Sequence, residues 1–150
     1  KKDYKVREKM ESLNATGRFE IPMDVINRSK LVGYWSTDAE GEARIREVFD
    51  RFGYVMDPHT AVAYDGAKKH GSANHVLVMA TASPYKFPDT VADALGIEGD
   101  GDVDLLKKIE DATGVSCPRP LRSVFDLPER FNKSITVEEM KEVVKEGFHD

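Results

Sequence analysis

The stretch HVLVMATASPYKFPD, residues 75–89, decides the fold. Residues 75–80 are the clearest predicted strand, and they are apolar on both faces, which is typical of a parallel strand covered by helices. The strand pattern ends at Thr81, and the turn that follows carries a second hydroxyl, Ser83. In open α/β sheets, ligands bind beyond the carboxyl ends of the strands. Thr81 and Ser83 are therefore candidate ligand-binding hydroxyls, although both residue types also form turns where no ligand binds.

A second run of strand character, LVGYWS, covers residues 31–36. Thr37 follows it, and Glu40 stands three places later, which is the pattern of a capping box. This predicts a helix over residues 38–52, with Gly53 as its left-handed stop. The helical spacing of apolar residues predicts further helices over 1–15, 23–30, 59–69, 87–96, 103–114 and 137–148.

The alternation of strands and helices predicts an α/β fold with a partial parallel sheet flanked by helices. Only two strands are clear, and two strands cannot form a doubly wound sheet. The chain also begins with Lys1 and not with Met. We therefore expect residues 1–150 to be a single segment of a longer protein, whose other part supplies the rest of the sheet.

Composition and charge narrow the classes of function. The 150 residues include 22 basic and 27 acidic side chains, for a net charge of −5, and 40% are hydrophobic. This length and composition suit one globular domain. The mild negative charge argues against nucleic acid or an anionic membrane surface as a partner. No apolar run approaches the ~18–20 residues that are needed to cross a bilayer.

The single cysteine, Cys117, excludes an internal disulfide and any cysteine-cluster zinc site. We expect it to be a partly buried structural thiol, because no histidine lies near it in the sequence. A lone thiol fits a reducing compartment, so we expect a cytoplasmic location. The histidines show no metal-ligand spacing, and no metal site is predicted.

The stretch MDPHTAVA, residues 56–63, forms the second candidate site. It predicts a helix with Asp57 as its N-cap and Pro58 at the first helical position, where a missing N–H costs nothing. Helix N-termini offer free N–H groups and a partial positive charge, so this turn and the turn at Thr81 can face one pocket. The plainer alternatives are that Asp57 only caps the helix and that His59 only lies in solvent.

Two stretches resemble the C-terminal third of threonine synthase: GYVMDPHTAVAY, residues 53–64, and VLVMATASPYKFPDTV, residues 76–91. The resemblance extends to the Thr-Gly-Arg-Phe segment at 16–19 and to GYWSTDAEGEARIREVF at 33–49, and it covers nearly the whole chain. The pair of motifs, DPHTAVA followed by TASPYKFP, is specific, whereas either motif alone would be a weaker signal.

This resemblance implies a pyridoxal-phosphate (PLP) enzyme of the tryptophan-synthase-β fold type, fold type II, with this chain in the C-terminal part of its large domain. Threonine synthase converts O-phospho-L-homoserine and water to L-threonine and phosphate. In this fold type a Ser or Thr hydroxyl faces the pyridine nitrogen, and motif position assigns that role to Thr81. Asp57 matches an acidic residue near the same ring edge, and Ser83 completes the expected cofactor-binding residues. His59 and Lys86 match motif positions without an assigned role.

The Schiff-base lysine and the glycine-rich phosphate loop of the family lie in parts of the enzyme that this sequence lacks. We therefore expect no catalytic residue in this chain, no activity of the chain alone, and a partner in the missing N-terminal part of the same protein. Two alternatives remain open. One is a noncatalytic α/β ligand-binding or interaction module derived from the same scaffold. The other is a different fold-type II enzyme such as a threonine dehydratase, although the pair of motifs argues against this alternative.

Overall fold

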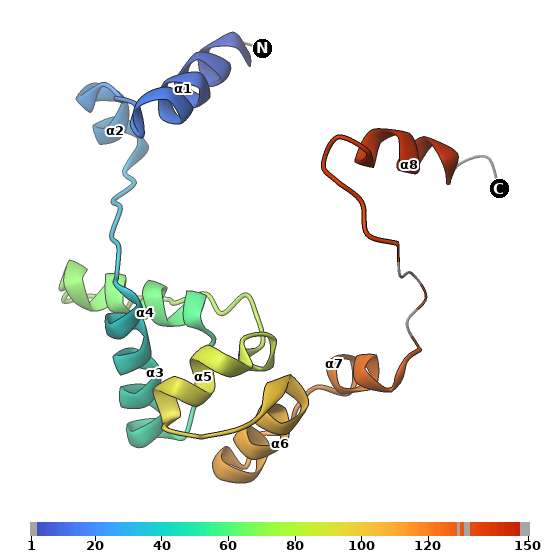
Figure 1. The fold of residues 1–150 in the computed structure, drawn as a ribbon. Helices are drawn as coiled ribbons and strands as arrows, with labels where there is room; N and C mark the ends of the chain where they lie inside the picture. Colours follow the sequence, from blue (N-terminus) through green and yellow to red (C-terminus); the bar gives the residue numbers. More distant parts are fainter. Residues whose placement is uncertain (1–2, 129, 131–132, 148–150) are drawn as a thin grey trace.

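The structure is a computed structural model that describes residues 3–128, 130 and 133–147 (Figure 1). Its α-helices are α1 (Asp3–Thr16), α2 (Met23–Ser29), α3 (Asp38–Phe52), α4 (Pro58–His70), α5 (Pro88–Leu95), α6 (Gly101–Thr113), α7 (Arg119–Arg122) and α8 (Met140–Glu146). Two short 3-10 helices, η1 (Pro84–Lys86) and η2 (Ser123–Asp126), lie between them. Within this described part, no helix is both long and apolar enough to cross a membrane.

Local capping contacts fix the ends of α3 and α4. The Thr37 hydroxyl accepts the N–H of Glu40 at 3.2 Å, and the Glu40 carboxylate accepts the N–H of Thr37 at 2.7 Å. The predicted capping box is therefore confirmed, and it satisfies two of the free donors at this helix end. Gly53 and Gly71 end the two helices with φ values of 66° and 65°, a backbone conformation that glycine adopts without steric cost.

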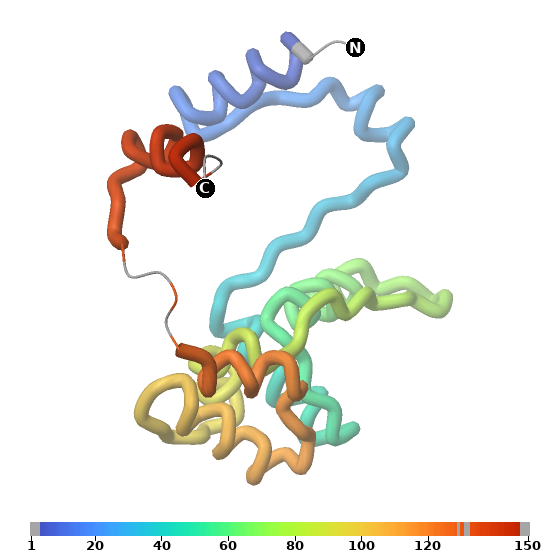
Figure 2. The backbone as a smooth tube through the Cα atoms, turned by 90° about the vertical axis from the view of Figure 1, so that its right-hand side faces the viewer, coloured from blue at the N-terminus to red at the C-terminus, as the bar shows by residue number. Residues whose placement is uncertain are grey.

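One hydrophobic core holds α3, α4, α5 and α6 together. α3 contacts both α4 and α5, and α5 contacts α6 and η1. We call residues 38–126 the helical body, because every buried apolar side chain of the described chain lies within it. α1, α2 and α8 contribute nothing to this core and stand apart from the body in both views (Figures 1 and 2). The core residues are Ile45, Val48, Val55, Met56, Ala61, Tyr85, Val91, Ala92, Ala94, Leu95, Leu105, Leu106, Ile109 and Cys117.

The partial parallel sheet is not confirmed. Residues 31–36 and 75–80 form no strand, and no β-strand occurs anywhere in the residues that the structure describes. A strand is stabilised by hydrogen bonds to a neighbouring strand, and the described chain offers neither segment such a neighbour. Their side chains are exposed as a result: Trp35 is 74% exposed and Leu77 is 84% exposed. The burial predicted for residues 76–80 is therefore absent in this chain.

These two segments and α4 border an open groove of about 650 Å³, which we call the apolar groove. Tyr34 lies closely against α4 at Gly66, where an added Cβ would come within 3.4 Å of the Tyr34 Cβ. The Tyr34 hydroxyl also hydrogen-bonds Nδ1 of His70 at 2.9 Å. The groove is lined by Lys30, Val32, Tyr34, His59, Val62, Ala63, Gly66, Ala67, His70, Val76, Leu77, Val78 and Met79.

Candidate functional site

The carboxylate of Asp57 caps α4 from a buried position. Asp57 is 1% exposed. Its Oδ1 accepts the N–H of His59 at 3.0 Å and the N–H of Thr60 at 3.3 Å, and its Oδ2 accepts the Thr60 hydroxyl. The predicted N-cap is confirmed, and both carboxylate oxygens are occupied by the chain itself.

The imidazole of His59 joins the two turns that the sequence singled out. Its Nδ1 lies 3.3 Å from Oδ1 of Asp57, and its ring centroid lies 4.9 Å from that of Phe87, with the planes tilted by 57°. Phe87 belongs to the turn that begins at Thr81, so this contact places the start of α4 beside that turn. We call Asp57, His59, Thr81, Ser83 and Phe87 the corner. His59 also lines the apolar groove.

The hydroxyls of the corner have different surroundings. Thr81 is exposed, and its hydroxyl has no hydrogen-bond partner among the residues that the structure describes. Ser83 is partly buried, and its Oγ accepts the N–H of Tyr85 at 3.3 Å, which caps η1. Lys86 is exposed at the end of η1. Thr81 therefore offers a free hydroxyl, whereas Ser83 already has a structural role in the turn.

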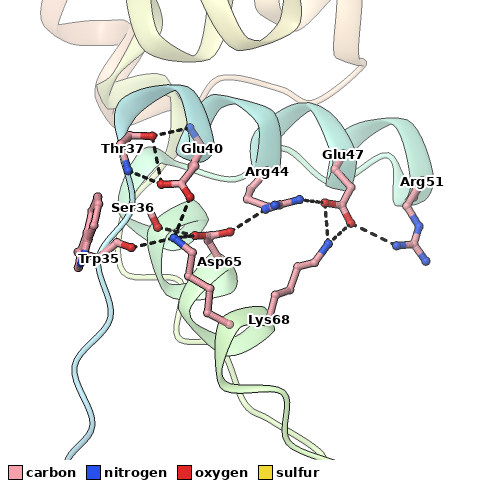
Figure 3. Close-up of polar contacts among 10 residues, drawn as sticks. Trp35, Ser36, Thr37, Glu40, Arg44, Glu47, Arg51, Asp65 and Lys68 are labelled. Atoms are coloured by element: carbon pink, nitrogen blue, oxygen red, sulfur yellow. Dashed lines mark hydrogen bonds and ion pairs between the residues drawn. The ribbon is translucent and has the colours of Figure 1, made fainter.

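An ion-pair network two turns further along α4 fixes this helix against α3 (Figure 3). Asp65 is 1% exposed, and its carboxylate accepts the Ser36 hydroxyl at 2.6 Å and Nε of Arg44 at 2.8 Å. Nζ of Lys69 lies 2.7 Å from the same carboxylate and 2.9 Å from the carbonyl oxygen of Trp35. The network thus holds the end of the first extended segment as well as the two helices. The motifs of the sequence did not predict this network, although the i,i+4 spacing of Asp65 and Lys69 is a signal for an ion pair.

These contacts stabilise the charged forms of two carboxyl groups. Hydrogen bonds from Lys69, Ser36 and Arg44 hold the pKa of Asp65 far below its usual range. Hydrogen bonds from Lys68 and Arg44 lower the pKa of Glu47 to about 2. Both groups therefore carry a full negative charge at neutral pH, and the α3–α4 contact is charged on both sides.

Other candidate chemistry is limited in the described residues. No group of three His, Cys, Asp or Glu side chains there could hold a metal ion. Cys117 is 6% exposed and belongs to the core, which agrees with the structural thiol predicted for it. The imidazole of His59 beside the capped start of α4 can bind and orient a polar ligand. The free hydroxyl of Thr81 lies in the turn that also carries Phe87, the ring that contacts His59.

Apolar extended segments that end in polar turns beside helix starts are typical of ligand sites in α/β proteins. Residues 60–144 match the family described as "Threonine synthase, C-terminal". The chain belongs to this family, as the resemblance of its motifs predicted.

Individual relatives extend this similarity over nearly the whole chain. A threonine synthase of Eremothecium gossypii is 29% identical over 153 residues, which cover 91% of this chain and 27% of that protein. Threonine synthase-like 1 of Mus musculus is 36% identical over 72 residues, 47% of this chain and 10% of that protein. The crystal structure of a PLP-bound threonine synthase from Brucella melitensis superposes with a TM-score of 0.62 at 29% identity. That match covers 99% of this chain and 29% of the Brucella chain.

The chain therefore spans about a quarter of the length of the Eremothecium gossypii relative, at 27%. Its likeness to the Brucella enzyme supports the fold type of the PLP-dependent threonine synthases.

Proposed function

We propose that this chain is the C-terminal segment of a PLP-dependent threonine synthase, a cytoplasmic lyase that converts O-phospho-L-homoserine and water to L-threonine and phosphate. The observation that carries the proposal is the corner. His59 contacts Phe87 at 4.9 Å, and this contact brings both family motifs to one place in a chain of this family. The N-terminal part of the enzyme would hold the Schiff-base lysine, so this segment alone would be inactive.

Thr81 has the chemistry that the cofactor requires at its pyridine nitrogen. A hydroxyl can donate a hydrogen bond to a neutral ring nitrogen, and the Thr81 hydroxyl is exposed and unpaired within the described chain. When bound, PLP supplies an electron sink that stabilises carbanions at the substrate carbons. Asp57 and Ser83 contribute by holding the two turns, since their side chains cap α4 and η1.

The apolar groove supports the view that the chain is one part of a larger fold. Val76 is 52%, Leu77 84% and Met79 65% exposed, and Leu31 at the first segment is 76% exposed. Contiguous exposed apolar surface of this kind marks a contact with other protein. We propose that strands from the remainder of the enzyme pair with residues 31–36 and 75–80 and complete the parallel sheet in the large domain.

The first test concerns Thr81 in the complete enzyme. Thr81→Val keeps the shape and removes only the hydroxyl, so we expect a changed cofactor absorption spectrum and reduced turnover with little change in the urea midpoint. Thr16→Val is the matched control, because the Thr16 hydroxyl bonds only backbone carbonyls near α1, apart from the helical body. Unchanged turnover and spectrum in Thr81→Val would remove Thr81 from the cofactor site.

The second test uses the chain by itself. We expect that mixing it with PLP, reducing with borohydride and mapping the modified residues by mass spectrometry will give no stoichiometric lysine adduct. A single adduct, for example at the exposed Lys86, would contradict the proposal. It would favour instead a chain that holds its own cofactor site.

A further inference from the structure

His59 has one ring nitrogen engaged and one free. Nδ1 lies 3.3 Å from Oδ1 of Asp57, and the ring lies against Phe87. The His59 side chain is nevertheless 66% exposed, and it lines the apolar groove. Nε2 has no partner among the described residues. A neutral or charged imidazole with a free Nε2 can bind a ligand at this nitrogen.

Asp57 determines which nitrogen is free. Its carboxylate is fixed by two backbone N–H groups and by the Thr60 hydroxyl, so it cannot turn away from His59. A carboxylate can only accept, and Nδ1 must therefore carry the proton in this contact. The Phe87 ring, 4.9 Å away, restricts the tilt of the imidazole. The pair thus presents Nε2 outward in one orientation, as an acceptor in the neutral ring and as a donor in the charged ring.

The lining of the apolar groove favours an anionic ligand over a cationic one. It contains no carboxylate, and it includes the cationic side chain of Lys30. The carboxylate of Asp57 already accepts hydrogen bonds from two backbone N–H groups and from the Thr60 hydroxyl. It lies on the Nδ1 side of the imidazole ring. It balances the positive charge that His59 carries when Nε2 also holds a proton. In that form Nε2–H can donate a charge-assisted hydrogen bond to an oxyanion.

We propose that His59 contacts the substrate of the reaction proposed above, with Nε2–H donating to an oxyanion of the phosphorylated amino acid, and that Asp57 is the positioning residue for this contact. The inference rests on the proposed function, because the ligand comes from that reaction. The oxyanion is either the phosphate group or the α-carboxylate, and both chemistries fit the same nitrogen.

The experiment uses the complete PLP-loaded enzyme with two probes, inorganic phosphate and L-homoserine. Each probe is titrated against the visible absorption of the cofactor, so that binding is measured apart from turnover. We expect His59→Leu to raise the dissociation constant of one probe about 10-fold or more, the loss expected for one charge-assisted hydrogen bond. His59→Gln should recover part of the lost affinity, because the glutamine amide can donate a hydrogen bond from near the position of Nε2. His70→Gln is the matched control, because His70 lines the same groove but bonds Tyr34.

Asp57→Asn separates positioning from capping. Asn caps a helix about as well as Asp, so the urea midpoint should change little. The negative charge behind the imidazole is lost, and the same probe should bind more weakly. A weaker phosphate complex assigns His59 to the phosphate, and a weaker homoserine complex assigns it to the carboxylate.

Two further outcomes are distinguishable. Unchanged affinity for both probes in a folded, PLP-loaded His59→Leu enzyme would overturn the role of His59 and leave the proposed function intact. A complete wild-type protein that forms no cofactor absorption band would overturn the proposed function, and the role of His59 with it.

Discussion

The two sides of α4 differ in how much of their surface this chain buries. On the side that faces α3, Ala61 and Asp65 are buried, and both carboxylate oxygens of Asp65 accept hydrogen bonds. On the side that faces the apolar groove, Val62 is 39% exposed and the neighbouring Leu77 is 84% exposed. One side is therefore closed by the sequence itself, while the other side presents an apolar surface without a cover in the described chain. The corner lies at the N-terminal end of α4.

The largest effect is expected in the core of the closed side. Ile45 is 0% exposed. Ile45→Ala removes buried methyl groups and leaves a cavity, so the free energy of unfolding of this chain should fall by about 2–5 kcal/mol. Urea unfolding followed by circular dichroism measures it. Ile21→Ala is the matched control, since Ile21 is 43% exposed outside the helical body. Equal losses in both variants would mean that the closed side has no packed core.

A fall in pH should have the second-largest effect on stability, because it protonates the carboxylates of the ion-pair network. The pKa values of Asp65 and Glu47 are lowered in the folded state, to about 2 for Glu47, whereas unfolded carboxyls titrate near about 4. Their contribution to stability is therefore present above about pH 4.5 and is lost as the pH falls toward about 2. Urea midpoints at several pH values test this, and Asp65→Asn should show a shallower decline than wild type. Parallel declines would show that Asp65 contributes no pH dependence.

The cap at the corner should have an intermediate effect. Asp57→Ala removes the side chain that accepts two backbone N–H groups, so the free energy of unfolding should fall by about 0.5–2 kcal/mol. Asp100→Ala is the control, because Asp100 stands at the N-cap of α6 without a side-chain hydrogen bond. If the two variants lose the same stability, the observed hydrogen bonds of Asp57 do not stabilise α4.

The smallest effect in this chain is expected on the open side of α4. Leu77→Ser changes a side chain that is 84% exposed, so the unfolding free energy of the chain should change by less than about 0.5 kcal/mol. In the complete enzyme the same change should cost about 1.5–3 kcal/mol, because a covered Leu loses its burial. Thermal or urea unfolding of both proteins gives the two values. An equally small effect in both would mean that the groove stays uncovered.

The two sides also explain which features could be predicted from sequence. The start of α3 and the N-cap of α4 depend on residues three places apart or fewer, such as Thr37 with Glu40, and the sequence predicted both. The sheet depends on neighbours that these residues do not supply, so its absence could not be derived from the apolar pattern of 75–80. The contact of Asp65 with Ser36 and Arg44 joins distant positions, and no local pattern specifies such a contact.

The corner was predicted in part. The sequence indicated that the turns at Asp57 and Thr81 can lie together, because both precede helices after strand-like runs. It did not identify Phe87 as the residue that makes the contact with His59. An aromatic ring beside a proline has many packing options, and only the three-dimensional arrangement selects one.

The contacts that hold the helical body together join elements that are neighbours, or nearly so, along the chain: α3 with α4 and α5, and α5 with η1 and α6. Chains with such local contacts fold quickly. The body can therefore form before any other part of a longer protein covers the apolar groove. In that interval, residues 75–80 present an exposed segment with free backbone groups and little charge, which is prone to pair with other chains. If the body folds first, this segment is the point at which a slowly assembled protein would aggregate.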